Sequence, residues 1–221
     1  DRPVVLIINE QELTLDTADW LWGKNTLETE MELKKKLGEN VCVACIGQAG
    51  ERCAGIAGIF SGLRAAGRGG AGAVMGSKKL KAIVTNGRRS IDVKDPQAWS
   101  AHRLIRMNET TIRHLPRHGT NNILETVNVM GGLPARNFQT TGVDDPDEIV
   151  GESWRKSVWL GDTACFNCPI GCSKTAVLRS GRYQGTVCDG PDYETTWALG
   201  PNCGVLDREA IVKANELCDL Y

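Results

Sequence analysis

Residues 64–78 read RAAGRGGAGAVMGSK, and glycine or alanine occupies most of these positions. Small side chains allow a backbone to approach a ligand closely, so that its free N–H groups can point at anionic oxygens. Arg64, Arg68 and Lys78 add positive charges to the same run. The pattern predicts a binding segment for a phosphorylated cofactor.

Two other interpretations of this run remain open from the sequence alone. A match to the dinucleotide pattern G-x-G-x-x-G starts at Gly67, and Asp92 follows at a suitable distance. That pattern is typical of a nicotinamide or flavin site when it directly follows a strand, but a turn-like SGLR at residues 61–64 intervenes. The run can also be a glycine-rich crossing between two sheets that binds no ligand.

A second motif lies at residues 165–172, CFNCPIGC, with the spacing C-x2-C-x3-C. Three thiolates in one tight loop suit a [4Fe–4S] cluster, because each can bind a different iron corner. Pro169 and Gly171 are expected to fix the turn, and a fourth ligand must come from elsewhere. Zinc also accepts such sulfurs, although its sites usually combine two C-x2-C pairs.

The chain has nine cysteines in total, and we expect thiols or metal ligands rather than disulfides because no secretory signal is present. Cys42 and Cys45 form a further C-x2-C, but they lie in a strand pattern, where residues three apart face opposite sides. We therefore expect both to be buried packing residues. A structural role is also expected for the isolated thiols, Cys53, Cys188, Cys203 and Cys218.

The composition is that of an ordinary globular protein, with 221 residues and a net charge of -1. This balance gives no electrostatic reason to expect binding to nucleic acid or to an acidic membrane surface. No apolar run approaches the about 20 residues that span a bilayer, and the first residues do not resemble a signal peptide. We expect a cytoplasmic protein. The missing initiator Met, and a last helix still running at Tyr221, suggest an internal piece of a longer chain.

Apolar patterning in the first part of the chain predicts strands at residues 4–8, 12–15, 41–46 and 81–85. Asp16 is expected to cap a short helical turn, and Thr26 a longer helix that Gly38 ends. The apolar face expected for that longer helix consists of Leu27, Met31, Leu33 and Leu37. Residues 70–77 are expected to begin another helix.

The pattern becomes mainly helical after the polar residues 88–94. Helix starts are expected at Asp95-Pro96, Thr120, Asp145-Pro146, Pro191 and Asp207, with a strand pair at 175–178 and 183–187. The fold class is therefore α+β, with one domain over residues 1–90 and the start of a helical domain over 91–221.

Five segments together resemble one family, and their order and spacing agree with it along nearly the whole chain. These are IGQAGE at 46–51, RAAGRGGAGAVMGSKKLKAI at 64–83, RNFQT at 136–140, the cysteine loop at 165–172, and GPDYE at 190–194 with WALG at 197–200. They resemble the aldehyde ferredoxin oxidoreductases, which are tungsten or molybdenum bis-pterin enzymes.

The resemblance implies an oxidoreductase that converts aldehydes to carboxylic acids. Its fold would be the second half of a two-sheet pterin-binding platform followed by the start of a mostly helical domain. Two pterins would hold the metal, with Mg²⁺ bridging their phosphates, and a [4Fe–4S] cluster would pass electrons to ferredoxin. The complete protein is expected to form a homodimer or a heteromeric complex.

The resemblance also assigns roles to residues. Arg64 would contact the pterin phosphates, the Ala65 carbonyl would face Mg²⁺, and Asp219 would hydrogen-bond a pterin. Glu194 would lie close to the metal as a general acid–base. The rest of the cofactor-binding segment would be Ala66, Gly67, Arg68, Gly69 and Gly70, and the cluster ligands would be Cys165, Cys168 and Cys172. The fourth cluster cysteine is expected outside this chain.

Two alternatives to aldehyde oxidation remain open. Some members of the family reduce the aromatic ring of a coenzyme A thioester, and the substrate pocket that separates these activities is built by other residues. A non-catalytic iron–sulfur electron-transfer module would carry the same cysteine loop without tungsten or pterin.

Overall fold

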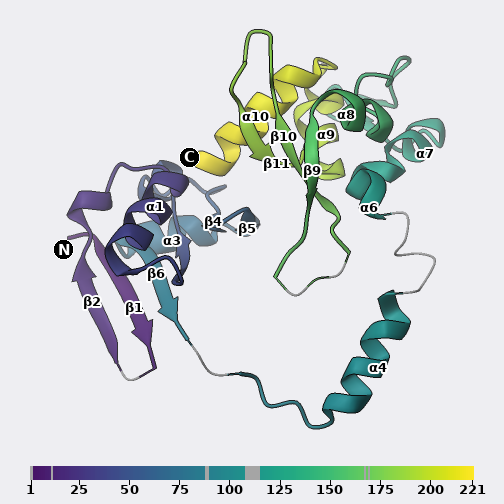
Figure 1. Ribbon diagram of the computed structural model, residues 1–221. Helices are drawn as coiled ribbons and strands as arrows, with labels where there is room; N and C mark the ends of the chain where they lie inside the picture. The colour runs from purple at the N-terminus through teal and green to yellow at the C-terminus, as the bar shows by residue number, and fades with distance from the viewer. Residues whose placement is uncertain (1, 11, 88–89, 108–114, 167, 169) are drawn as a thin grey trace. The chain divides into compact units, whose positions relative to one another are not determined.

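The computed structural model describes residues 2–10, 12–87, 90–107, 115–166, 168 and 170–221 (Figure 1). The chain divides into two compact units. Unit 1 is Asp1–Ile91 together with Cys218–Tyr221, and unit 2 is Asp92–Leu217. Sheets and helices occur in both units, which confirms the predicted α+β class. Within the described residues, no helix has the length and apolar character needed to cross a membrane.

Unit 1 is built on a six-stranded sheet with the order β2-β1-β6-β3-β4-β5. The strands β1 and β6 are parallel, and all other neighbouring pairs are antiparallel. The strand bounds are β1 Val4–Asn9, β2 Leu13–Thr17, β3 Cys42–Cys45, β4 Ile59–Ser61, β5 Arg64–Ala66 and β6 Leu80–Asn86. Figure 1 shows β1 between β2 and β6.

Alternation along the central strands places one apolar face of this sheet in the core of unit 1. Val43 pairs with Val84 in register, and both side chains are buried. Leu33 of α1 (Thr26–Leu37) and Leu21 of the short helix η1 (Asp19–Leu21) complete the same cluster. Burial of several such side chains, each contributing about 1.5–3 kcal/mol, holds the sheet and α1 together.

The ends and the buried face of α1 differ from the sequence prediction. Asn25, not Thr26, is the N-cap, and it forms a reciprocal capping box with Glu28. Leu27 and Met31 are 56% and 61% exposed, because the helix packs through Thr26, Thr29 and Leu33 instead. The predicted end at Gly38 is confirmed.

Asp16 does not cap a helix, which corrects the sequence prediction. It lies in β2, and η1 starts three residues later with Ala18 as its N-cap and no side-chain hydrogen bond. The alternating polar and apolar residues of β2 extend the strand beyond the predicted residues 12–15.

Unit 2 combines short helices with a three-stranded antiparallel sheet of order β11-β10-β9 and a two-stranded ladder, β7–β8. Its strands are β7 Pro134–Ala135, β8 Thr140–Thr141, β9 Trp159–Thr163, β10 Ser173–Val177 and β11 Val187–Asp189. Its helices are α4 Pro96–Met107, α6 Leu115–His118, η2 Gly119–Ile123, α7 Leu124–Val129, α8 Gly151–Ser157, α9 Tyr193–Leu199, η3 Pro201–Cys203 and α10 Arg208–Leu220, whose last residues belong to unit 1.

Two tryptophans lie at the centre of the core of unit 2. Trp154 and Trp159 stack with ring centroids 6.5 Å apart. Each indole N–H donates to a backbone carbonyl, that of Ile149 at 2.7 Å and that of Gly190 at 3.1 Å, so neither polar group is buried without a partner. The Trp159 bond connects β9 to the segment that precedes α9.

Two of the predicted helix starts in unit 2 are confirmed, and a third lies further along the chain. Asp95 and Asp207 cap α4 and α10, as predicted, through hydrogen bonds from the N–H groups of Ala98 and Glu209. The helix expected from Asp145-Pro146 begins only at Gly151, because those two residues lie in an irregular stretch that precedes α8.

Two more elements of unit 2 shift along the chain. The expected helix at Thr120 opens as a 3-10 turn before α7, and α9 begins at Tyr193 rather than at Pro191. The strand β9 was not predicted. It pairs antiparallel with β10, so these two strands flank the cysteine loop that connects them.

The close backbone contact between α2 (Gln48–Glu51) and α3 (Ala71–Ser77), at Gly50 and Gly76, can be tested by substitution. A Cβ added at Gly76 would lie 1.8 Å from the carbonyl oxygen of Gly50. Gly76→Ala should therefore destabilise the chain by about 1–3 kcal/mol or more in urea unfolding. Gly67→Ala is the matched control, because no described atom lies within 4 Å of its added Cβ. Equal loss of stability in both variants would contradict this packing.

Candidate cofactor-binding segments

The first candidate segment spans the end of the β4–β5 hairpin and the loop that follows. Arg64, the first residue of β5, pairs with Ser61 across a two-residue turn. Residues 65–69 are exposed, whereas Arg64 and Gly70 are partly buried. Gly70, with φ +69°, is the N-cap of α3. The structure thus presents Ala65, Ala66, Gly67, Arg68 and Gly69 as a continuous exposed run of backbone.

The glycines of this segment divide into two groups with different functions. An added Cβ at Gly67 or Gly69 meets no described atom within 4 Å. An added Cβ would lie 2.7 Å from the Gly55 oxygen at Gly70 and 2.4 Å from the Gly58 oxygen at Gly72. The later glycines therefore serve packing, while the earlier ones leave room for a ligand. The run does not cross between two sheets, because it joins β5 and β6 of the same sheet.

The topology excludes a dinucleotide-binding βαβ unit here. Helix α3 connects β5 to β6, and β5 is related to β6 by three successive antiparallel pairings through β4 and β3. The two strands consequently run antiparallel. A dinucleotide fingerprint needs parallel strands joined by a crossover helix, so the glycine match at Gly67 has no such meaning.

A buried ion pair holds α2 behind this segment. Lys81 of β6 is fully buried, and its ammonium group donates to the carbonyl of Lys24 at 2.8 Å and to the carboxylate of Glu51. Glu51 also accepts from the N–H of Gly23 at 2.9 Å. Since α2 packs against α3 through Gly50 and Gly76, this pair sets the position of the helix that follows the exposed loop. Sequence reasoning did not identify it.

Asp219 lies in the last turn of α10, in the same unit as the glycine-arginine segment. Its backbone carbonyl accepts from the hydroxyl of Thr26 at 2.7 Å, at the start of α1. Close by, the N–H of Ala49 donates to the carbonyl of Tyr221 at 2.9 Å, and a Cβ at Gly47 would lie 2.4 Å from that oxygen. Gly47 is therefore required for this approach.

The second candidate segment is the loop between β9 and β10, which Figure 1 shows extending beyond the strands. Cys165 is exposed, and Cys168 and Cys172 are partly buried. The N–H of Cys168 donates to the carbonyl of Cys165 at 2.9 Å, which forms a tight turn. The expected role of Pro169 lies outside the described residues, as does Asn167. Phe166 is 96% exposed, so the loop presents an uncovered surface.

The surroundings of Cys172 disfavour its thiolate. Burial, then the charges of Asp192, Cys165 and Cys168, raise the pKa of the Cys172 thiol. None of the nine cysteines, all in the described part of the chain, forms a disulfide. Over the same part, no three His, Cys, Asp or Glu side chains are gathered closely enough to hold a metal ion. The donor chemistry of three thiols on one hairpin loop fits three corners of an iron–sulfur cluster.

Glu194 lies in the first turn of α9, in the same unit as the cysteine loop. Its carboxylate oxygen Oε2 accepts from the indole N–H of Trp197 at 3.0 Å. The ring of Trp197 meets that of Phe138 edge-to-face, with centroids 5.8 Å apart. Asp192, the N-cap of α9, is close enough to Cys172 to affect its pKa. The charge at the start of α9 therefore acts on the last thiol of the cysteine loop.

A strained turn supports Phe138. Arg136, Asn137 and Phe138 have φ values of +49°, +56° and +61°, in the left-handed region that costs non-glycine residues about 1–3 kcal/mol each. Their N–H groups donate to the carbonyl of Pro201, the carbonyl of Asn202 and the Asn202 side chain. These contacts, made by residues far along the chain, hold a conformation that the sequence pattern RNFQT did not predict.

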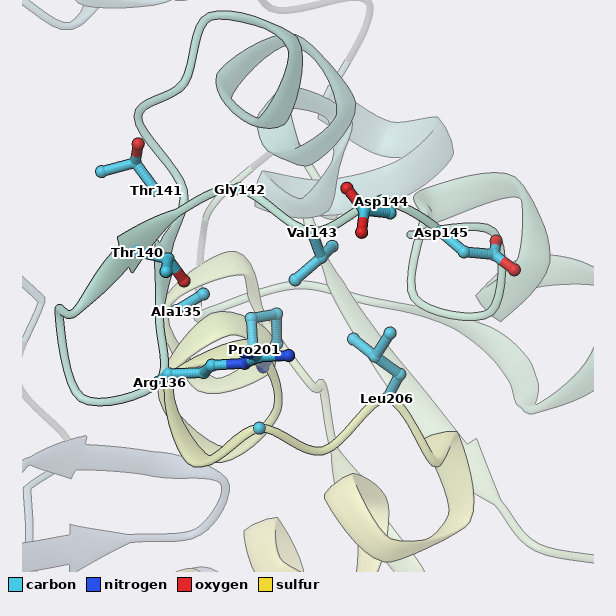
Figure 2. Close-up of a pocket in the computed structure, with 11 residues that line it drawn as sticks. Ala135, Arg136, Thr140, Thr141, Gly142, Val143, Asp144, Asp145, Pro201 and Leu206 are labelled. Atoms are coloured by element: carbon cyan, nitrogen blue, oxygen red, sulfur yellow. The ribbon is translucent and has the colours of Figure 1, made fainter.

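The same turn borders an open cavity of about 480 Å³ in unit 2. Figure 2 shows Arg136 and Pro201 at one end of it and Asp144 and Asp145 at the other. Thr140 and Thr141 of β8 line one side. None of the site residues expected from the sequence lines this cavity.

The C-x2-C pair of β3 is split by the alternation of the strand. Cys45 is 1% exposed and belongs to the core of unit 1, as predicted. Cys42 is exposed, so the prediction that both thiols are buried is wrong for Cys42. Residues three apart on a strand face opposite sides, so the thiols of Cys42 and Cys45 cannot both coordinate one metal ion on one face of the sheet.

This difference can be measured by alkylation. Burial raises the pKa of the Cys45 thiol from 9.0 to about 12, and the nucleophilic thiolate is then almost absent at pH 8. Mass spectrometry after brief treatment of the native chain should find Cys42 and Cys53 modified and Cys45 unmodified. The denatured chain should react at all nine thiols. Equal rates at Cys42 and Cys45 would contradict the assigned burial.

Comparison with known proteins agrees with the two motifs. Residues 1–87 match a family model described as the N-terminal domain of aldehyde ferredoxin oxidoreductase, and residues 98–221 match the model for its domains 2 and 3. The chain belongs to the aldehyde ferredoxin oxidoreductase family.

Individual relatives cover the whole chain. The tungsten-containing aldehyde ferredoxin oxidoreductases of Thermococcus kodakarensis and Pyrococcus horikoshii are 38% and 39% identical to it, over 100% of this chain and 37% of each relative. An aliphatic sulfonate oxidoreductase, WOR-like subunit, of Pyrococcus furiosus is 31% identical over 98% of the chain and 38% of that protein. The chain thus spans little more than a third of the length of these relatives.

A solved structure is similar over the same range. The active site complex BamBC of benzoyl coenzyme A reductase, in complex with 1,5-dienoyl-CoA, matches with a TM-score of 0.75 and 25% identity. The match covers 99% of this chain and 35% of the other.

Proposed function

We propose that this chain is part of an oxidoreductase that converts aldehydes to carboxylic acids at a tungsten (or molybdenum) bis-pterin centre. Electrons would leave through a [4Fe–4S] cluster to ferredoxin or another iron–sulfur acceptor. The observation that carries the proposal is the presence, in a chain of this family, of both an exposed backbone run at residues 65–69, next to Arg64, and a loop bearing three thiols. The names of the relatives include both tungsten and ferredoxin.

The glycine-arginine segment would hold the pterin phosphates. Exposed backbone at Ala65, Ala66 and Gly67 can approach a ligand, and the open space over Gly67 and Gly69 leaves room for it. Arg64 and Arg68 would supply positive charge, and guanidinium groups match phosphate oxygens in geometry. The Ala65 carbonyl would face Mg²⁺, and Gly70 would set the start of α3. Asp219, in the same unit, would hydrogen-bond a pterin.

The cysteine loop would hold the cluster. Thiolates of Cys165, Cys168 and Cys172 would bind three iron corners, and the fourth ligand would come from outside this chain. When bound, the metal–pterin centre supplies two-electron redox chemistry and the cluster carries electrons one at a time.

Glu194 of α9 would serve as the general acid–base of the reaction. Oxidation of an aldehyde with one water yields a carboxylic acid, two electrons and two protons. The Glu194 carboxylate would accept one of these protons, a role that general acid–base residues fill when they lie near the reacting group. The hydrogen bond from Trp197 holds one carboxylate oxygen, and Phe138 packs against Trp197 from the left-handed turn.

A second candidate function is reduction of an aromatic coenzyme A thioester. The structural similarity to benzoyl coenzyme A reductase over 99% of the chain favours it. Both activities would use the same cofactor segments, so substrate assays on the complete protein must separate them. Aldehyde-dependent reduction of a low-potential dye supports the first proposal, and turnover of an aromatic thioester alone supports the second.

The proposed role of Glu194 predicts a defined loss of activity. In the complete protein, Glu194→Gln should lower kcat for aldehyde oxidation by about 10²–10⁴-fold with normal tungsten and iron contents. Trp197→Phe, which removes one hydrogen bond to the carboxylate, should cost about tenfold. Glu209→Gln is the matched control, because Glu209 occupies the first turn of α10. Unchanged turnover in Glu194→Gln, with normal metal loading, would remove Glu194 from the mechanism.

A further inference from the structure

A buried ammonium group lies directly behind the cysteine loop. Lys174, two residues after Cys172, is 1% exposed. Its Nζ donates to the carbonyl of Gly171, within the loop, at 3.2 Å and to the carbonyl of Pro116 at 2.6 Å. A carboxylate oxygen of Asp162 lies 3.0 Å away, and the ring centroid of Trp159 lies 5.8 Å away. Each of these four groups stabilises a cation.

The carboxylate beside Lys174 also serves a second cation. Arg155 lies 2.9 Å from the same Asp162 oxygen. Partial burial alone would raise the pKa of Asp162, but the hydrogen bonds and charges of Lys174 and Arg155 together hold it below its ordinary value. Two positive charges therefore share one negative charge. By contrast, the other fully buried lysine, Lys81, has the buried Glu51 carboxylate as its ion-pair partner.

The backbone of Cys172 is confined from two directions. Gly119 has φ +58°, and a Cβ added there would lie 2.4 Å from the Cys172 carbonyl oxygen and 3.8 Å from Cε of Lys174. On the other side, the Gly171 carbonyl accepts from Lys174. The end of the cysteine loop is therefore fixed by Gly119 and by the ammonium group, whereas Phe166 on the same loop is 96% exposed.

We propose that Lys174 is a positioning residue for the cysteine loop and that its charge raises the reduction potential of the cluster that Cys165, Cys168 and Cys172 hold. This inference rests on the proposed iron–sulfur function. One-electron reduction makes a cluster more negative, so a cation fixed nearby stabilises the reduced form. Charge and hydrogen bonding around the cluster are known determinants of its potential. Asp162 should act in the opposite direction.

The test is a redox titration of the complete protein, monitored by electron paramagnetic resonance, with iron content measured in parallel. Lys174→Met keeps the side-chain length and removes the charge, so the reduced fraction at the wild-type midpoint potential should fall severalfold. Lys174→Arg keeps the charge and should restore most of that fraction. Asp162→Asn removes the anion and should increase it. Lys156→Met, at a lysine that is 73% exposed in the same unit, is the matched control and should leave it unchanged.

The opposite signs expected for Lys174→Met and Asp162→Asn separate the proposal from a purely structural role, which would not reverse the shift. An unchanged potential in Lys174→Met with full iron content would overturn it. If Lys174→Met fails to bind iron, the reduction potentials of Lys174→Arg and Asp162→Asn test the proposal instead. A lower reduction potential in Asp162→Asn would then overturn the proposal. Absence of any cluster signal from the wild-type protein would instead refute the iron–sulfur function itself.

Discussion

A lysine ammonium group removed from water must be surrounded by oxygen atoms, and this requirement organises both units. Lys81 is satisfied by the Lys24 carbonyl and the Glu51 carboxylate, and Lys174 by two carbonyls and Asp162. Removing one partner of a buried pair such as Lys81–Glu51 typically costs about 3–5 kcal/mol, because an uncompensated charge remains. The partners of each lysine come from separate parts of the chain, so each ammonium group fixes several elements at once.

Both lysines lie behind an exposed candidate segment. Lys81 holds α2 through Glu51, and α2 packs against α3, which follows the Arg64–Gly69 backbone. Lys174 holds the end of the cysteine loop through Gly171. A surface segment that binds a large cofactor must keep its shape while remaining uncovered, and a rigid buried support is a physical means to that end. A buried lysine would therefore support the proposed phosphate-binding segment in unit 1 and the thiol-bearing loop in unit 2 in the same way.

The sequence predicted those features that depend on neighbouring residues. The strand β6 followed from its apolar run, and Asp95 and Asp207 were recognised as caps because their partners lie within three residues. The same local reasoning failed at α1, where Asn25 and Thr26 are both good caps and Glu28 decides in favour of Asn25. The α1 face was misjudged because packing of the helix, and not its apolar periodicity, selects the buried side.

Long-range features could not be predicted in this way. Lys174 lies directly before the strand predicted at 175–178, where the sequence gives no sign of its burial, and its contact with Pro116 spans 58 residues. The left-handed turn at 136–138 depends on Pro201 and Asn202, more than 60 residues later, and its residues are not glycine. The glycine-arginine run and the cysteine loop were predicted as binding segments from residue types and spacing, whereas the roles of Glu194 and Asp219 came from family resemblance. The exposure and support of these segments are what the structure adds.

The most direct test of the account is the metal and pterin content of the purified complete protein. If the Arg64–Gly69 backbone and the cysteine loop hold the two proposed cofactors, tungsten or molybdenum, extractable pterin and iron should be found together in the same folded preparation. Iron without pterin or a heavy transition metal would show that the glycine-arginine segment does not bind this cofactor. A folded protein containing none of the three would contradict the account as a whole.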